Sequence, residues 1–287
     1  MASQFLVVDG NPREAREKHE AEFGKTSAGS YVELLKWLEP AAASVVLNGA
    51  DGGRAEADGD LARFDAVVIT GSQLHVQEMS PEVTRQLDLM RAVFRAEVPA
   101  FGSCWGVQVA GTVAGGEARR NPKGPEYGFA RRLAPVNGKL QHPPLLRGRP
   151  PAYYAPAIHL DAVVAPPPDC DVLASNEVLP LQAVEIRHEG GVFWGVQYYP
   201  ELDLFELSVM LRLMASDVVA EGLCSSEAEV LAYAEELQAL HAEPERADLA
   251  WRDGLDAEVI DPIRRTGEIR NFIEHCVKPT KSAHGRA

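Results

Sequence analysis

Short runs of consecutive apolar residues alternate with amphipathic stretches over the first two thirds of the chain. The runs lie at residues 5–8, 44–47, 66–70 and 98–102. Consecutive rather than alternating apolar residues are typical of strands that are covered on both faces of a parallel sheet. Ser80-Pro81 predicts a helix start between two of these runs, with serine as the N-cap and proline at the first helical position. The pattern predicts an α/β fold with a doubly wound, mostly parallel sheet and flanking helices.

The remaining part of this region has less regular patterning. Residues 118–168 carry proline clusters, which predict surface loops or sheet edges rather than a linker. Residues 183–186 and 192–197 predict a hairpin around Glu189-Gly190-Gly191. Residues 201–221 predict one helix that ends at Gly222. We therefore expect the main domain to span residues 1–222.

The tail has a helical pattern of its own. Ser226 and Glu229 have the spacing of a capping box, and Asp261-Pro262 predicts a further helix start. Four apolar residues then recur at the i, i+3, i+4 and i+7 positions: Ile269, Phe272, Ile273 and Cys276. Because an amphipathic helix must bury its apolar face, we expect residues 223–287 to form a helical appendage that covers the main domain or contacts a second subunit.

Charge and composition exclude several classes of protein. The 287 residues include 28 basic and 42 acidic ones, which gives a net charge of −14 and disfavours nucleic acid as a partner. No run approaches the ~18 apolar residues of a membrane span. The four cysteines form no CxxC pair, so neither a metal site nor a disulfide scaffold is expected. We expect a cytoplasmic protein that needs no cofactor.

The apolar run at 98–102 leads directly into Gly102-Ser103-Cys104-Trp105-Gly106. A cysteine between a strand and a helix, with glycine two positions away on each side, has the pattern of a nucleophile elbow. The small residues let strand and helix pass closely, and the helix N-terminus favours a thiolate. The N–H of Trp105 then points to where an oxyanion would develop. Cys104 is the candidate nucleophile.

Several ordered motifs resemble those of a known family. The elbow and Gln108 match the pattern G-x-C-x-G-x-Q, and residues 195–201 read Gly-Val-Gln-Tyr-Tyr-Pro-Glu. With Ile69-Thr70-Gly71-Ser72 and His159-Leu160-Asp161, the chain resembles the class I (triad-type) glutamine amidotransferases, in particular stand-alone members similar to the glutaminase domain of GMP synthetase. The resemblance covers residues 3–222.

The resemblance implies roles for individual residues. It implies a flavodoxin-like sheet, with Cys104 as nucleophile and the N–H groups of Gly71 and Trp105 as the oxyanion hole. It implies that Gln108, Ser72 and His159 bind the substrate. Residues 199 and 201 occupy the positions of the family's catalytic histidine and its orienting carboxylate, and here they are Tyr199 and Glu201.

Tyr199 is therefore a departure from the family pattern. A phenol has a pKa near 10 and is a poor base for a thiol of pKa near 8.5. It can donate a hydrogen bond to a thiolate or an oxyanion, but it does not easily carry a proton to a leaving amine. Loss of an acid–base group typically lowers the rate by ~10²–10⁴-fold. His75 or His159 could take its place, although each is typical of a structural histidine.

Three functions follow, from different classes. In the first, an enzyme hydrolyses the γ-carboxamide of glutamine or of a γ-glutamyl amide through a thioester on Cys104, and it can supply ammonia to a separate synthetase or acceptor protein. In the second, Tyr199 prevents turnover and the chain is a binding or regulatory module. In the third, Cys104 and Tyr199 perform a different reaction on the same fold. The residues favour an enzyme and leave the three alternatives open.

Overall fold

Five parallel strands form the half of the sheet that carries the elbow. The computed structural model describes residues 2–51, 61–136 and 144–283. Within these ranges the main sheet has nine strands, and its parallel half has the order β2 (Ala43–Asn48), β1 (Gln4–Asp9), β3 (Ala66–Ile69), β4 (Ala100–Ser103) and β11 (Gly191–Val196). The four apolar runs become β1 to β4, as predicted. β1, β3 and β4 are buried inside the sheet, whereas β2 is an exposed edge strand.

The other half of the sheet is antiparallel. It continues from β11 through β10 (Ala183–His188), β9 (Cys170–Ser175), β6 (Glu126–Pro135) and β7 (Tyr153–His159). The predicted hairpin is confirmed as β10 and β11, which pair around Glu189 and Gly190, both at positive φ. A separate pair, β5 (Glu117–Arg120) and β8 (Asp161–Ala165), lies nearby. The loops expected over 118–168 therefore alternate with strands that the pattern did not predict.

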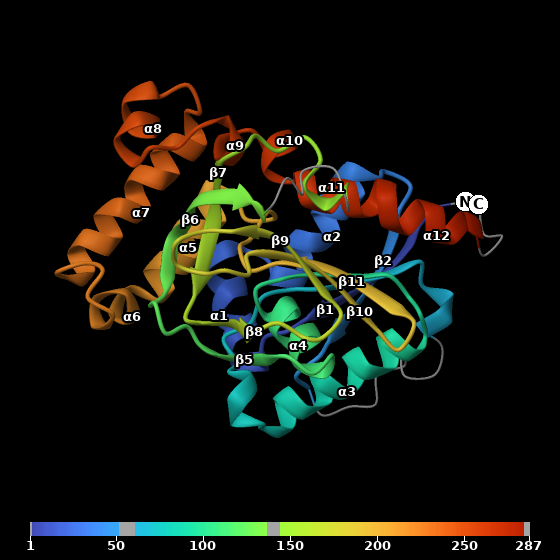
Figure 1. The fold of residues 1–287 in the computed structure, drawn as a ribbon. Helices are drawn as coiled ribbons and strands as arrows, with labels where there is room; N and C mark the ends of the chain where they lie inside the picture. Colours follow the sequence, from blue (N-terminus) through green and yellow to red (C-terminus); the bar gives the residue numbers. More distant parts are fainter. Residues whose placement is uncertain (1, 52–60, 137–143, 284–287) are drawn as a thin grey trace.

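Helices cover both faces of the sheet, as the predicted α/β fold requires. Figure 1 shows α3 (Pro81–Arg95) on one side, and α2 (Ser27–Leu38) with the red tail helices on the other. α3 and α4 (Trp105–Val113) share one apolar cluster with the sheet, whereas α2 shares a second cluster with the tail. Ser80 caps α3, accepting from Val83 N at 3.4 Å, and Pro81 is its first residue, as expected. The doubly wound architecture is confirmed.

Two details of the helices differ from the prediction. The helix expected over 201–221 is divided into α5 (Leu204–Leu213) and α6 (Ala215–Ala220), because Met214 leaves helical geometry at ψ 19°. Glu201 therefore precedes α5, whose N-cap is Asp203. α1 (Arg13–Phe23) was not predicted; its residues are mostly polar and its apolar face is weak. Both α1 and α5 contribute to the cavity described below.

The tail is helical, as predicted. It comprises α7 (Glu227–Ala242), α8 (Ala247–Asp253), α9 (Ala257–Ile260), α10 (Pro262–Arg265), α11 (Gly267–Phe272), a π-helical turn (Ile273–Val277) and α12 (Lys278–Ala283). Ser226 caps α7, but Glu229 returns its bond to Ser225 N, one residue earlier than in a capping box. None of the helices in the described ranges is long and apolar enough to cross a membrane.

The predicted apolar face of the tail is buried against the sheet. Phe272 is fully buried, with its ring 5.5 Å from that of Phe101 on β4 and 6.2 Å from that of Trp194 on β11. Arg149 joins Glu268 on α11 through two hydrogen bonds of 2.7 and 2.8 Å, and Tyr198 donates to the same carboxylate at 2.8 Å. The last helices thus complete one face of the sheet. The domain boundary at residue 222 stays a prediction.

Candidate functional site

Cys104 lies in the strained turn between β4 and α4. Its backbone has φ 49° and ψ −96°, a left-handed conformation that non-glycine residues rarely adopt. A Cβ on Gly102 would lie 2.8 Å from Gly106 Cα, and one on Gly106 would lie 3.1 Å from Ile69 O. Gly102 is therefore required for the close approach of strand and helix, and a side chain at Gly106 would fit only if the neighbouring backbone shifted slightly. The geometry is that of a nucleophile elbow, at the carboxyl end of the strand where open α/β sheets place their sites.

The elbow forms part of the wall of a cavity of about 420 Å³. This volume is within the usual range for small-molecule sites, roughly 300–1,000 Å³. Seven of the eight residues expected at the site line it: Gly71, Ser72, Cys104, Gln108, His159, Tyr199 and Glu201. Trp105 does not line it, because its side chain is buried in the core with Nε1 donating to Gln86 at 2.7 Å. Only the backbone of Trp105 is available to the site.

The thiol of Cys104 has polar neighbours on several sides. Its sulfur donates to the backbone oxygen of Ile158 at 4.0 Å, and the nearby hydroxyl of Tyr199 and N–H of Trp105 lower the pKa of the thiol. Burial has the opposite and larger effect, and the nearby Glu201 adds to it, so the pKa of Cys104 is raised to about 12. The helix N-terminus therefore does not produce a thiolate in the unliganded protein, contrary to the expectation from the elbow alone.

Tyr199 packs directly against the glycine of the expected oxyanion hole. A Cβ built on Gly71 would lie 2.5 Å from Tyr199 Cε1 and 2.7 Å from its hydroxyl oxygen, so no other residue fits at position 71. Burial raises the pKa of Tyr199 well above 10, and its contact with Cys104 acts in the same direction. The phenol is neutral, and its hydroxyl lies beside Gly71 and interacts with Cys104.

Glu201 does not pair with Tyr199 as the family pattern would suggest. Its Oε1 accepts from Ser103 Oγ at 2.5 Å, and Ser103 Oγ is in turn 2.8 Å from the hydroxyl of Tyr31. Oε2 is buried and has no hydrogen-bond partner among the described residues. Burial raises the pKa of Glu201 to about 7, although the bond from Ser103 opposes it.

The three expected substrate-binding residues have different surroundings. Gln108 lies one helical turn after Cys104, with Nε2 4.0 Å from the sulfur and donating to the backbone oxygen of Asp161 at 2.9 Å. Ser72 lines the cavity, but its hydroxyl donates to Gly10 O at 2.8 Å and accepts from Leu74 N at 3.1 Å. Ser72 thus holds the loop that carries Gly71.

His159 is paired with a carboxylate behind the cavity wall. Its Nε2 lies 2.9 Å from Glu126 Oε2, on the neighbouring strand β6. Glu126 also accepts from Asn176 at 2.7 Å and from Gln182 at 2.6 Å, so it is fully engaged. Only 1% of the His159 side chain is exposed. This environment favours a structural histidine over a replacement acid–base group.

A second histidine–carboxylate pair lies at one end of the cavity, which we call the His75 end. His75 Nδ1 is 2.7 Å from Asp161 Oδ2, and Gln77 Nε2 donates to the same oxygen at 3.1 Å. The bond to Asp161 raises the pKa of His75. Burial acts to raise the pKa of Asp161, but the hydrogen bonds from His75 and Gln77 outweigh it and the net change is downward. Both groups therefore favour their charged forms.

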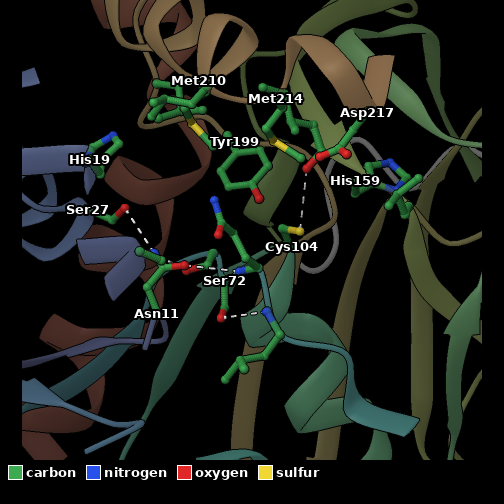
Figure 2. Close-up of a pocket in the computed structure, with 18 of the residues that line it drawn as sticks. Asn11, His19, Ser27, Ser72, Cys104, His159, Tyr199, Met210, Met214 and Asp217 are labelled. Atoms are coloured by element: carbon green, nitrogen blue, oxygen red, sulfur yellow. Dashed lines mark hydrogen bonds between the residues drawn. The ribbon is translucent and has the colours of Figure 1, made fainter. Parts of the chain in front are cut away.

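A third pair lies at the opposite end, the His19 end. His19 on α1 and Glu206 on α5 both line the cavity, with His19 Nε2 3.5 Å from Glu206 Oε1. Burial lowers the pKa of His19 and raises that of Glu206 to about 8, despite hydrogen bonds of 2.9 and 3.0 Å between Ser30 and the carboxyl oxygens. Both groups favour their neutral forms. Figure 2 shows His19 and Ser27 on one side of Tyr199, and Cys104, His159 and Asp217 on the other.

No group of three histidine, cysteine, aspartate or glutamate side chains is arranged to hold a metal ion in the described part of the chain. The four cysteines, all of them described, are free.

Comparison with known proteins agrees with this geometry. The model of the family "Glutamine amidotransferase class-I" matches residues 27–211, which is more than half of the chain. The chain belongs to the class-I glutamine amidotransferase family.

Individual relatives and a solved structure are similar to this chain over much of its length. A γ-glutamyl-L-1-hydroxyisopropylamide hydrolase from a Pseudomonas species is 30% identical over 96% of this chain and 94% of its own length. A glutamine-hydrolyzing GMP synthase subunit from Sulfolobus acidocaldarius is 35% identical over 50% of this chain and 70% of its own. The structure of a glutamine amidotransferase from Thermotoga maritima covers 97% of this chain and 99% of its own, with a TM-score of 0.64 at 16% identity. At that identity the structure supports the fold alone.

Within this family the cavity has features that motif matching does not reveal. The motifs identify Cys104, Gly71 and Gln108, which are close in sequence to a strand end. They do not identify His19, Ser27 or Glu206, because these residues come from three separate helices and no short sequence pattern joins them. His75 was a candidate from its place after the Gly71 loop, but its pairing with Asp161 depends on the tertiary fold.

Proposed function

We propose that the protein is a Cys104-dependent hydrolase of γ-glutamyl amides, a class that includes glutamine. The observation that carries this proposal is the strained elbow, which holds Cys104 in a cavity beside Gly71 and Tyr199. The family supports it, and so does the relative that is named as a γ-glutamyl amide hydrolase and aligns over nearly the whole chain.

In the first step the Cys104 sulfur attacks the γ-carbonyl carbon, and the N–H groups of Gly71 and Trp105 stabilise the oxyanion. Collapse of this intermediate breaks the C–N bond and leaves a thioester on Cys104. The leaving amine takes one proton. Water then attacks the thioester, which releases glutamate and restores the thiol.

The proton of the thiol needs an acceptor, since the pKa of Cys104 is raised to about 12. Glu201 has a pKa of about 7, which suits a group that both accepts and returns a proton near neutral pH. We propose that Tyr199 connects them. Its hydroxyl accepts the thiol proton while its own proton passes to Glu201, whose charge acts on both Cys104 and Tyr199 although no hydrogen bond joins the phenol to this carboxyl within the described residues. The reverse transfer protonates the leaving amine.

An electrophilic glutamine analogue such as 6-diazo-5-oxo-norleucine tests the proposal. We expect it to label Cys104 in the parent protein, with loss of amide hydrolysis, and Cys104→Ala to show neither labelling nor hydrolysis. Cys170→Ala, which removes a half-buried thiol outside the cavity, is the matched control and should be labelled like the parent. An intact fold without labelling by any such electrophile would overturn the enzymatic proposal.

The raised pKa of Cys104 and the presence of Tyr199 also favour a second candidate, a binding or regulatory module. In that case the cavity binds a γ-glutamyl compound without turnover. Calorimetry would then give measurable affinity for glutamine or a γ-glutamyl amide in a protein that the analogue does not label.

Delivery of ammonia to a separate synthetase would extend the first proposal, because several relatives are named as subunits of a glutamine-hydrolyzing GMP synthase. Release of free ammonia by the isolated chain at full rate would argue against a need for such a partner.

A further inference from the structure

Residues that line the cavity lie on both sides of the Tyr199 phenol (Figure 2). The His19 end is lined by Asn11, Ala15, Lys18, His19, Ser27, Glu206 and Met210. On the side of Cys104, Gln108 lies 4.0 Å from the sulfur and bonds to Asp161, which in turn holds His75. A γ-glutamyl amide whose carbonyl carbon lies over the sulfur has its acyl part on one side and its amine part on the other. Each end of the cavity therefore receives one part of the substrate.

Charge determines which part goes where. The glutamyl part carries an α-ammonium and an α-carboxylate, and buried charges are costly unless they are paired. The His75 end offers a cation and an anion, held 2.7 Å apart and open to solvent, with 37% of the His75 side chain exposed. The buried part of the His19 end offers a neutral imidazole and a neutral carboxyl group, whose side chains are only 8% and 4% exposed, while the charged Lys18 beside it is exposed to solvent. The charged glutamyl part fits the His75 end, which leaves the buried part of the His19 end for an uncharged amine substituent.

His19 also has an unused acceptor. Its Nδ1 is 3.0 Å from the backbone oxygen of Lys25, which can only accept, so Nδ1 carries the proton of the neutral ring. Nε2 is then a bare acceptor. It is buried and makes no hydrogen bond within the described residues, because the neutral Glu206 carboxyl stays 3.5 Å away and is bonded by Ser30, so a closer donor from a ligand would satisfy it. Ala15 and Met210 in the same wall provide apolar contact for a short alkyl chain.

We propose that the His19 end is a subsite for the amine part of the substrate, and that it selects a short uncharged alkyl chain whose hydroxyl group donates to His19 Nε2. The preferred substrates are then γ-glutamyl hydroxyalkylamides, the class for which the Pseudomonas relative is named. Glutamine leaves this subsite empty. The inference rests on the proposed function, since it assigns the amine side of the same reaction.

Three substrates separate the contribution of the alkyl chain from that of its hydroxyl group: L-glutamine, γ-L-glutamylethylamide and γ-L-glutamyl-2-hydroxyethylamide. We expect the parent protein to prefer the hydroxyethylamide. His19→Leu should lower kcat/KM for the hydroxyethylamide by about tenfold, the usual effect of one lost hydrogen bond, and leave the other two within about twofold. His275→Leu, the same exchange on a helix outside the cavity, should change none of the three.

A second variant tests the same subsite in case His19→Leu does not fold. Met210→Trp fills the His19 end, so it should reduce hydrolysis of both substituted amides by ~10-fold or more while glutamine hydrolysis is retained. The inference is wrong if His19→Leu lowers all three rates equally, or if Met210→Trp affects glutamine as much as the substituted amides.

A binding measurement keeps this test separate from that of the proposed function. If the parent protein hydrolyses none of the three compounds, the proposed function fails. Calorimetry with Cys104→Ala then tests the subsite alone, because it measures binding without hydrolysis. Tighter binding of the hydroxyethylamide than of the ethylamide, lost in Cys104→Ala combined with His19→Leu, would support the subsite. Equal binding of the two amides would overturn it.

Discussion

The two ends of the cavity contain the same kind of pair, a histidine beside a carboxylate, and yet they differ in charge. At the His75 end the two groups are 2.7 Å apart, and the changes in pKa of His75 and Asp161 both favour ions. At the His19 end the separation is 3.5 Å, and the changes for His19 and Glu206 both favour neutral groups. One cavity thus has an ionic pair at one end and a neutral pair at the other.

Burial accounts for the difference. The His75 side chain is 37% exposed, so water and a short hydrogen bond together stabilise the ion pair. The His19 pair is almost completely buried, and at 3.5 Å its attraction does not offset the loss of hydration. The identity of the residues therefore does not decide their charge. Distance and exposure do, and they make one end suitable for a charged ligand and the other for a neutral one.

Tyr199 lies between the two ends, and its replacement has the largest expected effect. Tyr199→His restores an imidazole beside Cys104 and should raise glutaminase activity by ~10²-fold. Steady-state hydrolysis of glutamine measures it. Tyr199→Phe is the matched control and should lower the activity, because it removes the hydroxyl whose interaction with the sulfur lowers the pKa of the thiol.

The opposite result would be equally informative. If Tyr199→His is labelled at Cys104 by the glutamine analogue but loses the parent's native activity, the phenol serves a different reaction, and the assignment of the two ends to acyl and amine parts of an amide fails.

Glu201 gives the next largest effect, through pH. Its carboxylate form must accept the thiol proton, and burial raises its pKa to about 7. We therefore expect kcat/KM to fall by about tenfold per pH unit below pH 7 and to level off above it. Profiles of the parent and of Glu201→Gln between pH 5 and 8 check this. A parent profile without a break near pH 7 would contradict the role of Glu201 as base.

At the His75 end, Asp161→Asn should lower kcat/KM by roughly tenfold for all three amide substrates alike, because they share the glutamyl part and a hydrogen bond to a charged group is lost. Asp88→Asn, which breaks an exposed ion pair with Arg91, is the control and should change nothing. The two ends are distinguished if Asp161→Asn lowers kcat/KM equally for all three amides, whereas His19→Leu lowers it for the hydroxyethylamide alone. If Asp161→Asn lowered kcat/KM for only one amide, the His75 end would bind the amine part rather than the glutamyl part.

At the His19 end, Glu206→Gln has the smallest expected effect and concerns stability. Burial raises the pKa of Glu206 from 4.5 to about 8 in the folded protein, so between these pH values the native state holds a proton that the unfolded state has released. The proton held by Glu206 therefore makes the free energy of unfolding fall as pH rises, by at most about 1.4 kcal/mol per pH unit. Glu206→Gln cannot release this proton, so its stability does not change with pH for this reason.

Urea unfolding of the parent and of Glu206→Gln at pH 5 and pH 8 measures this difference. The variant should gain stability relative to the parent at the higher pH. An unchanged difference between the two proteins at both pH values would show that Glu206 is ionised at neutral pH, and the neutral pair would not exist.

The sequence by itself determined the framework of the molecule. The apolar runs of β1, β3 and β4 are consecutive because both faces of these strands are covered, whereas β2 carries such a run at an exposed edge. In each case the pattern is local. The elbow is local too, since Gly102, Cys104 and Gly106 are within five residues of one another and their small size is what the turn needs. The hairpin and the buried face around Phe272 follow for the same reason: each depends on the spacing of neighbouring residues.

Only the tertiary structure decided the chemistry of the cavity. Glu201 was expected beside Tyr199 but bonds to Ser103, and the thiol expected to ionise at a helix N-terminus has a pKa of about 12. His19 and Glu206 are 187 positions apart and meet because α1 and α5 pack together. Charge states depend on burial and on partners from distant segments, and neither is encoded in the spacing of adjacent residues.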